Sequence, residues 1–377
     1  MTASHLAAAL LGTAAALSVS LAATASGAIQ FKVTNLVSDG SVPATTVDPA
    51  LINPWGVSFA PTGPFWVSDN GTGVSTLYNG GGAKLGLTVA IPPAGASAPT
   101  GQVFNNSASA FQIGGTKPVF LFDGEDGTIS GWAGSFGSSA QIAVTSQIDA
   151  IYKGLAIDGA GSRLYATDFH NGDVELYTNN FAGFTTFTDP AVAAGFAPFN
   201  AQVLGGELYV TFALQDADRE DDVAGAGNGY VDVFNLDGTF NRRIASQGDE
   251  VNSPWGLAIA PASFGGLAGS LLVGNFGDGT ISAFDPLSGA FRGRLRGLDG
   301  LPLVLGDLWA LTPGNGAAAG DTQKIYFTAG LSDEAHGLFG SLTAVPEPRA
   351  WLMMILGFGL AGAALRRRER GLWSELA

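Results

Sequence analysis

The chain has 377 residues, of which 55 are Gly, 18 are Pro and none is Cys, and only 13% are charged. Hydrophobic residues make up 46% of it, too many for a disordered polymer, and Gly is too rare for collagen. Without Cys the chain forms no disulfide, thiolate metal site or Cys nucleophile. The net charge of −15 also argues against nucleic acid as a partner, because phosphate backbones are repelled. The composition therefore indicates a packed, turn-rich protein.

Residues 1–28 are predicted to be a signal peptide. Residues 6–23 are almost entirely Ala, Leu, Val, Ser and Thr, and Ser26, Gly27 and Ala28 suit a cleavage site that requires small residues. The first strand-like run, residues 29–37, follows directly. The alternative is a buried N-terminal helix, because the stretch before the apolar run has no Lys or Arg.

The other end of the chain, residues 345–370, has a different pattern. Pro346, Glu347 and Pro348 precede an apolar run of 16 residues, 350–365, which is followed by an arginine cluster at residues 366–370. The run is shorter than the ~20 residues of a usual bilayer span, but flanking arginines permit a thin span. The pattern predicts a short C-terminal transmembrane helix whose basic end stays cytoplasmic. Residues 371–377 form a tail.

The order of these elements resembles the PEP-CTERM sorting signal of Gram-negative bacteria. The resemblance implies recognition by an exosortase-type processing protease, transient residence in the inner membrane, and delivery to the cell surface or extracellular matrix. The tail is longer than this pattern usually has. Between the two ends, 12 basic and 29 acidic residues remain. The exported part is therefore more acidic than the whole chain, with a net charge of −17.

One unit recurs six times between the two ends. It consists of an apolar strand, usually ending in an acid or amide, then a turn that is usually Gly-rich, and a second strand of alternating residues that ends in an aromatic side chain. This pattern is typical of a β-hairpin. The six pairs of strands are residues 65–69 with 74–78, 119–123 with 128–132, 164–168 with 173–177, 208–212 with 230–234, 271–275 with 280–284, and 325–329 with 336–339.

A short segment precedes each hairpin, and in most copies a bulky residue in it is followed by a small one. The second of these residues falls at positions 56, 101, 154, 200, 256 and 310, at separations of 45 to 56 residues. Repeats of this length with several short strands indicate propeller blades, in which Gly lets innermost strands approach closely. We expect residues 31–37 to be the outer strand of the last blade and to close the ring. Residues 29–344 are thus predicted to form an all-β, six-bladed β-propeller; two stacked β-sandwiches are the alternative.

The Trp-Gly segments resemble those of NHL-like six-bladed propellers. Longer blocks, among them residues 53–56, 65–73, 222–229, 272–279 and 333–337, resemble a bacterial family of uncharacterised exported proteins that often end in PEP-CTERM signals. This resemblance covers nearly all of residues 30–343. It implies the fold and the export, and it brings no assigned activity.

Polar residues follow the strands of the predicted blades. Such strand ends can gather a ring of oxygen ligands for Ca²⁺ at the mouth of the channel. The alternative is that each Asp or Asn caps its own turn, the usual reason for these residues to follow a strand. The residues concerned are Asp69, Asn70, Asp126, Asp168, His170, Asp216, Asn275 and Asp333.

After removal of the signal peptide, His170 and His336 are the remaining histidines. Each is a weak candidate for a general base, His170 with Asp168, and His336 with Asp333 or Glu334. The alternative is a solvated or packed side chain. No Gly-x-Ser-x-Gly, His-Glu-x-x-His or phosphate-binding Gly-Lys-Ser motif occurs, so the common hydrolases and nucleotide-binding proteins find no support.

An acidic loop interrupts the fourth hairpin. Asp216, Asp218, Glu220 and Asp222 are predicted to bind Ca²⁺, because alternating acids begin a calcium loop. The loop departs from an EF-hand at Asp221, where Gly is required, and further on lacks the bidentate Glu. The alternative is a solvated, charged loop.

These observations favour a non-enzymatic binding or scaffold module in the envelope or extracellular polymer. Exopolysaccharide and envelope proteins are its expected partners. One alternative is a calcium-dependent propeller hydrolase or lactonase with His170 or His336 as the base. Another is a purely architectural matrix protein without a specific ligand.

Overall fold

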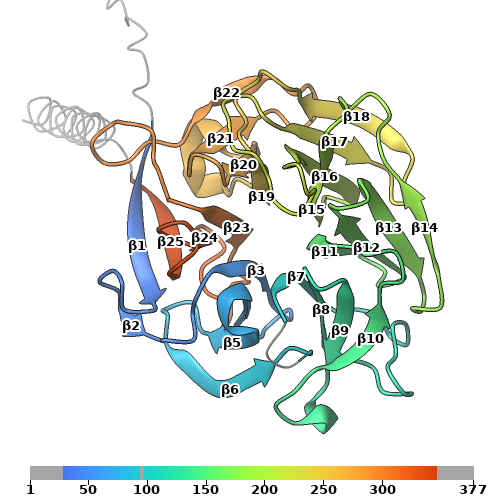
Figure 1. The fold of residues 1–377 in the computed structure, drawn as a ribbon. Coiled ribbons are helices and arrows are strands. Elements are labelled where there is room, and N and C mark those ends of the chain that lie inside the picture. The colour runs from blue at the N-terminus through green and yellow to red at the C-terminus, as the bar shows by residue number, and fades with distance from the viewer. Residues whose placement is uncertain (1–28, 94–96, 346–377) are drawn as a thin grey trace, which may run out of the picture.

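A computed structural model describes residues 29–93 and 97–345. Six sheets, all but one of them wholly antiparallel, are arranged as blades around one axis, as the ribbon shows (Figure 1). Within these residues, helix is limited to three short 3₁₀ segments, Asn70–Thr72, Gly134–Phe136 and Ala262–Leu267. The predicted all-β, six-bladed propeller is confirmed.

The first five blades each have four strands, which follow one another in chain order from the axis to the outer edge. The innermost strand of every blade contains the short segment that recurs in the sequence. The first blade consists of β3 Pro54–Ser58, β4 Phe65–Asp69, β5 Val74–Tyr78 and β6 Lys84–Ala90, and the second of β7 Pro99–Phe104, β8 Phe120–Gly124, β9 Thr128–Trp132 and β10 Gln141–Thr145. The third consists of β11 Tyr152–Ile157, β12 Arg163–Asp168, β13 Asp173–Thr178 and β14 Phe184–Phe187, and the fourth of β15 Phe196–Leu204, β16 Glu207–Leu214, β17 Tyr230–Phe234 and β18 Phe240–Ala245. The fifth consists of β19 Pro254–Ile259, β20 Leu271–Asn275, β21 Ile281–Phe284 and β22 Phe291–Arg294.

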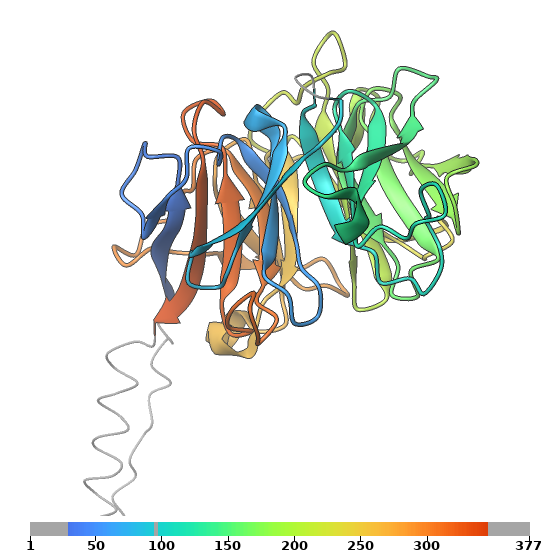
Figure 2. The ribbon, with the colours of Figure 1, turned by 90° about the horizontal axis from the view of Figure 1, so that it is seen from below.

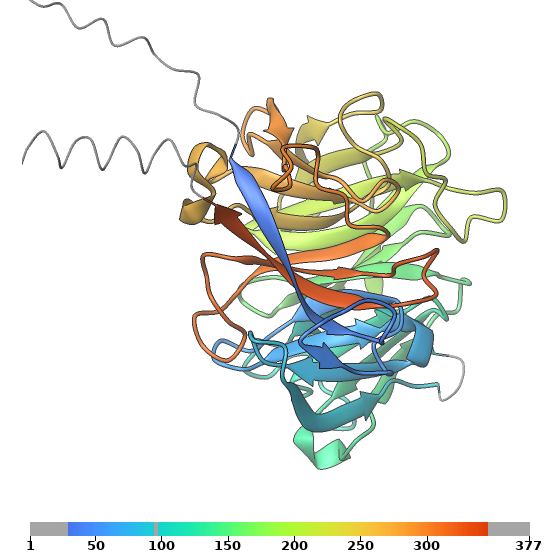
Figure 3. The ribbon, with the colours of Figure 1, turned by 90° about the vertical axis from the view of Figure 1, so that its left-hand side faces the viewer.

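The sixth blade joins the two ends of the described chain. Its inner strands are β23 Leu308–Pro313, β24 Ile325–Ala329 and β25 Leu338–Val345, and its outer strands are β1 Gln30–Ser38 and the short β2 Thr46–Val47. β1 is antiparallel to β25, so that Gln30 lies opposite Val345 and Ser38 opposite Leu338. The two strands lie side by side in Figure 3. The prediction that the N-terminal strand closes the last blade is therefore confirmed.

Glycines of the inner strands let neighbouring blades meet near the axis. A Cβ atom added at Gly56 would lie 2.5 Å from the carbonyl oxygen of Thr100 in the next blade. One added at Gly101 would lie 2.2 Å from the backbone nitrogen of Leu155. Contacts this short are impossible for a real side chain, so these two positions require Gly.

Apolar clusters fill the space between neighbouring blades. The cluster between the fifth and sixth blades includes Phe31 of β1, Phe264 and Leu305, and Ile29 packs against it. The first strand is thus anchored in the core as well as paired with β25. The predicted signal peptide and C-terminal helix lie outside the described residues. No helix within residues 29–93 and 97–345 is long and apolar enough to cross a membrane.

Candidate binding site at the channel mouth

Six equivalent side chains, one from each inner strand, surround the propeller axis: Trp55, Thr100, Lys153, Phe199, Trp255 and Trp309. Trp55 stacks on Trp309 with ring centroids 3.5 Å apart, and Phe276 stacks on the same ring at 4.1 Å. Together with Phe169 and Ala310, these aromatic rings form one buried cluster. Cavities lie on both sides of this cluster. One, of about 360 Å³, lies at the end of the channel where Asp222 and Glu334 line it. The inner strands line another, of about 230 Å³, toward the opposite end. The first is here called the mouth.

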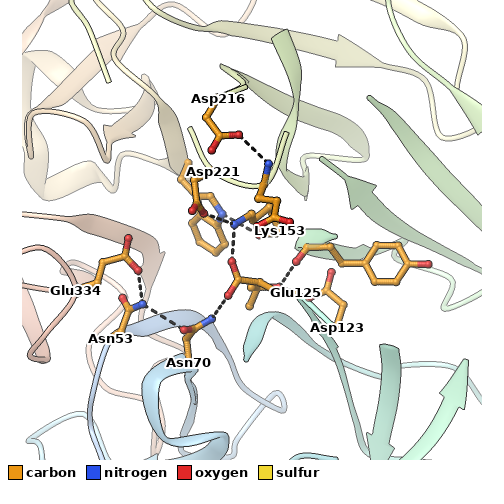
Figure 4. Close-up of polar contacts among 12 residues, drawn as sticks. Asn53, Asn70, Asp123, Glu125, Lys153, Asp216, Asp221 and Glu334 are labelled. Atoms are coloured by element: carbon orange, nitrogen blue, oxygen red, sulfur yellow. Dashed lines mark hydrogen bonds and ion pairs between the residues drawn. The ribbon is translucent and has the colours of Figure 1, made fainter. Parts of the chain in front are cut away.

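Lys153 provides the cation of the mouth. Its side chain is 2% exposed, and its Nζ forms ion pairs with Glu125 and, at 3.0 Å, with Asp221. The same Nζ lies 5.4 Å from the centroid of the Trp55 ring, within the range of a cation–π contact. Burial lowers the pKa of Lys153, but the two carboxylates outweigh burial and hold the pKa above its ordinary value. The site therefore keeps a buried ammonium charged (Figure 4).

Two asparagines hold the acids of the mouth in place. Asn70 Nδ2 donates to Glu125 at 3.0 Å, and Asn53 Nδ2 donates both to Asn70 Oδ1, at 3.3 Å, and to Glu334. Asn53 Oδ1 accepts a hydrogen bond of 2.9 Å from the indole of Trp309. Figure 4 shows this chain of contacts from Glu334 through Asn53 and Asn70 to Glu125. It links the first, second and sixth blades and fixes where the carboxylates lie.

The wall of the mouth is strongly acidic. Besides Lys153, its charged lining residues are Asp221, Asp222, Asp307, Asp333 and Glu334. Burial raises the pKa of Glu334 to about 7 and that of Asp222 to about 6. Two buried polar atoms at this wall, Asp222 Oδ2 and Trp55 Nε1, have no hydrogen-bond partner among the described residues. The mouth thus combines an excess of negative charge with unused hydrogen-bonding capacity.

The loop that contains Asp333 and Glu334 has a strained backbone. Leu331, Ser332, Asp333 and Glu334 all have positive φ angles, between 43° and 63°. Such a left-handed turn costs about 1–2 kcal/mol for each residue other than Gly. The turn is held by hydrogen bonds from Gly330 N to Asp307 O, at 2.8 Å, and from Asn53 N to His336 O, at 3.0 Å. Sparsely populated backbone conformations of this kind cluster at functional sites.

Most of the polar residues predicted at strand ends form hydrogen bonds within their own turn or hairpin. Thr76 Oγ1 donates to Asp69 at 2.7 Å, Asn171 Nδ2 donates to Asp168 at 2.6 Å, and Asn275 Nδ2 donates to Thr280 at 3.0 Å. Asp126 likewise accepts from Thr128. Asn70 and Asp333 do reach the mouth. Across the part of the chain that the structure describes, no group of three His, Asp or Glu side chains is arranged to hold a metal ion.

The two histidines lie on different blades. His170 Nε2 is 3.4 Å from Arg219 Nη2, and its Nδ1 is buried without a partner among the described residues. His336 Nδ1 is 2.7 Å from Asp39 Oδ2. No hydrogen bond within the described ranges joins either imidazole to the acid that the sequence suggested for it. The structure thus places the two histidines in separate surroundings.

The acidic loop divides its side chains between two tasks. Asp216 Oδ1 accepts a hydrogen bond of 2.9 Å from Glu220 N and so caps the loop. Asp222 lines the mouth, whereas Asp218 and Glu220 are exposed. Asp221, whose place in the sequence only departs from the pattern of a calcium loop, pairs with Lys153.

Sequence reasoning missed Lys153 and Glu125 as residues of the site. A signal for Lys153 existed: it stands where the first, fifth and sixth repeats carry Trp and the fourth carries Phe. A charged residue at an otherwise mainly aromatic position of a repeat indicates a special environment. Glu125 had no comparable signal, because it lies in a turn and its partners come from other blades.

Comparison with known proteins identifies relatives and the C-terminal motif. Residues 344–368 match the PEP-CTERM protein-sorting motif. The chain is 33% identical over 329 residues to Uncharacterized protein R648 of Acanthamoeba polyphaga mimivirus, which covers 83% of this chain and 80% of the viral one. Uncharacterized protein L690 of the same virus is 34% identical over 336 residues, covering 83% and 85%. This chain belongs to the same family as these viral proteins.

Solved structures with a similar arrangement are more distant. A streptogramin B lyase has a TM-score of 0.48 and 10% identity, and covers 84% of this chain and 98% of its own. Virginiamycin B lyase from Staphylococcus aureus has a TM-score of 0.49 and 11% identity, covering 84% and 100%. The sheet topology confirms the expected six-bladed propeller, and the family match confirms the PEP-CTERM signal. The motif implies export through the membrane of a Gram-negative bacterium and processing by an exosortase.

Proposed function

We propose that this protein is an exported binding module whose channel mouth takes an amine-bearing saccharide unit of an extracellular polymer. One observation carries the proposal: the mouth already holds one ammonium, that of Lys153, between carboxylates and beside an aromatic ring. Four further carboxylates, those of Asp222, Asp307, Asp333 and Glu334, line the cavity. A second ammonium, supplied by a ligand, would meet the same chemistry.

The physical chemistry of the lining favours such a ligand. Charge-assisted hydrogen bonds between an ammonium and carboxylates are about twice as strong as neutral ones. Aromatic faces such as Phe276, half-buried at the mouth, attract cations and cover apolar ring surfaces. The volume of about 360 Å³ falls within the usual range of small-ligand pockets. Asp222 Oδ2 and Trp55 Nε1 would gain the partners that they lack.

Glucosamine oligomers and their N-acetylated counterparts test the ligand class, because they differ mainly in the charged amine. In calorimetric titrations we expect the glucosamine oligomers to bind and the N-acetylated ones not to. Glu334→Gln combined with Asp222→Asn should weaken binding at least about tenfold, the loss of one charge-assisted pair or more. Asp237→Asn is the matched control, because Asp237 lies in the exposed turn between β17 and β18. Equal binding of both oligomers would contradict an amine-bearing ligand but would still support a binding module.

We also propose association with the cell surface or matrix through the C-terminal segment. The apolar run and the arginines would hold the chain in the inner membrane until an exosortase acts near Pro346, Glu347 and Pro348. Deleting residues 345–370 should move the propeller to the soluble fraction. Unchanged fractionation of that deletion would contradict the attachment.

The alternatives differ in what the same assays return. A calcium-dependent hydrolase or lactonase would turn over a lactone or ester, with activity lost on His170→Ala or His336→Ala. A purely architectural protein would bind none of the oligomers and would still be retained in the matrix fraction. Binding of glucosamine oligomers without turnover supports the binding module.

A further inference from the structure

Residues 295–305 form a small hairpin that projects from the fifth blade. The side chains of Leu295, Leu303 and Leu305 pack in the apolar cluster between the fifth and sixth blades and anchor the hairpin there. Its backbone is closed by hydrogen bonds from Gly297 N to Leu301 O, at 2.9 Å, and from Leu303 N to Leu295 O, at 2.9 Å. The hairpin is thus a fixed part of the fold.

The outer side of this hairpin is apolar and exposed. The exposed fractions are 56% for Leu298, 62% for Leu301 and 60% for Val304. The hairpin carries one basic and one acidic residue, Arg296 and Asp299, whereas the exported part as a whole has a net charge of −17. Three neighbouring large apolar side chains on a rigid projection without net charge are unusual on a soluble surface and mark an interaction site.

The hairpin stands beside the point where the chain leaves the propeller for the sorting motif. Phe31 N donates to Arg296 O at 2.8 Å, and Gln30 is bridged to Arg296. Gln30 in turn lies opposite Val345, the last described residue. Two strand spacings therefore separate Val345 from Arg296, about 10 Å. The four residues from Pro346 to Arg349 can span at most about 14 Å before the apolar run begins at Ala350.

We propose that the exposed face of this hairpin rests on the lipid bilayer that holds the apolar run of residues 350–365. The distances just given keep the hairpin close enough to reach the bilayer surface when that run lies within it. Leu298, Leu301 and Val304 then enter the interface, where apolar side chains on a neutral surface bind without attraction to anionic lipids. The length of the tether and the position of its origin thus identify a lipid surface as the occupant.

This contact also orients the propeller. β25 begins next to the loop that carries Glu334 and ends at Val345, about 24 Å further along the strand. Figure 2 shows the blades edge-on, with the start of β1 and the end of β25 at one end of the propeller. The mouth lies at the other end, so it faces away from the membrane and stays open to a ligand while the chain is attached.

Single-cysteine labelling tests the proposal cleanly, because the chain has no Cys of its own. The full chain, with Leu301→Cys carrying an environment-sensitive dye, is reconstituted into phosphatidylethanolamine vesicles with and without phosphatidylglycerol. Ala217→Cys, in the exposed loop at the mouth, is the matched control. We expect a blue-shifted emission at position 301 and at least about twofold stronger quenching by headgroup nitroxide lipids than at 217, as for side chains that enter the interface. Adding Leu298→Asn and Val304→Asn should shift the emission of the dye at position 301 back to that of a label in water and lower its quenching.

Each other outcome overturns the proposal. Equal quenching at 301 and 217 would show that the hairpin stays in water. A blue shift that appears without vesicles and rises with protein concentration would assign the surface to a second copy of the chain. Neither result bears on ligand binding at the mouth, so the proposed function is tested separately.

Discussion

At the scale of single residues, one buried ammonium sets the charge balance of the mouth. Lys153 neutralises Glu125 and Asp221, whose side chains are 28% and 76% exposed. Its Nζ lies over the rings of Trp55 and Phe169, and Trp255 Nε1 donates to its carbonyl oxygen at 2.9 Å. Removal of the charge therefore affects both the acids and the packing around the axis.

We predict that Lys153→Met lowers the free energy of unfolding by about 2–3 kcal/mol. Breaking a fully buried ion pair costs about 3–5 kcal/mol, and the exposure of Asp221 reduces that figure. Urea denaturation measures the change. Lys32→Met is the control, because Lys32 is exposed on β1 and has no ion pair among the described residues; a change within about 0.5 kcal/mol is expected there. Equal effects of the two substitutions would contradict the prediction.

The sequence predicted the site unevenly at this scale. The recurrence of their segments with the period of the blades predicts Trp55, Trp255 and Trp309 near the axis. The partners of Lys153 could not be found in the same way. Glu125 and Asp221 come from turns of two different blades, and the meeting of turns depends on the curvature of the whole ring.

At the scale of strands, the alternation of apolar residues predicted the hairpins and the inner segments of all six blades. It did not predict the outermost strands of the first five blades. β14, for example, is exposed at Phe184 and at the two residues that follow it. A strand that buries little carries no period-2 pattern, so nothing in its sequence separates it from a loop.

Close packing of inner strands gives a prediction with a matched control. Gly101→Ala should lower the free energy of unfolding by at least about 2 kcal/mol, because its Cβ would collide with the backbone of Leu155. Gly86→Ala, in β6, meets no atom within 4 Å and should change stability by less than about 1 kcal/mol. Thermal melts of the two variants compare them directly. Equal melting temperatures would mean that the inner strands have room to move apart.

The loop of residues 216–222 is predicted to bind Ca²⁺ and to be stiffened by it. Five acids within seven residues repel one another, and Arg219 together with Lys153, which pairs with Asp221, still leaves the loop with an excess of negative charge. At a hundredfold excess over Kd, binding stabilises the folded form by ~2.7 kcal/mol. Melts with Ca²⁺ should exceed those with chelator, and the difference should shrink in Asp216→Asn with Asp218→Asn. Equal melts of the wild type would leave Asp216 as the cap of a solvated turn.

At the scale of the whole molecule, acids buried within the blades link stability to pH. Burial raises the pKa of Asp123 and of Glu175 to about 7. Asp123 accepts a hydrogen bond from Thr100, and Glu175 accepts from Tyr152 and Tyr177, all of them buried. The native state therefore binds protons more tightly than the unfolded chain, whose carboxyls titrate near pH 4.

We predict that the free energy of unfolding rises as the pH is lowered from about 8 to about 5. Below about pH 4 it should fall again, because Arg242 lowers the pKa of Glu207 through hydrogen bonds and that pair is lost on protonation. Urea denaturation at several pH values measures the profile. Asp123→Asn combined with Glu175→Gln should flatten the slope between pH 5 and 8. A flat profile in the wild type would contradict the prediction.

The pairing of β1 with β25 also has a consequence for the timing of export. A chain that crosses the membrane from its N-terminus delivers β1 first and β25 last, because these strands lie at opposite ends of the described sequence. Until β25 arrives, β1 has no antiparallel partner and the sixth sheet cannot form. The residues that complete the ring are followed at once by the sorting motif. The strand that completes the ring and the sorting motif therefore emerge together, so the motif becomes available only when the last blade can form.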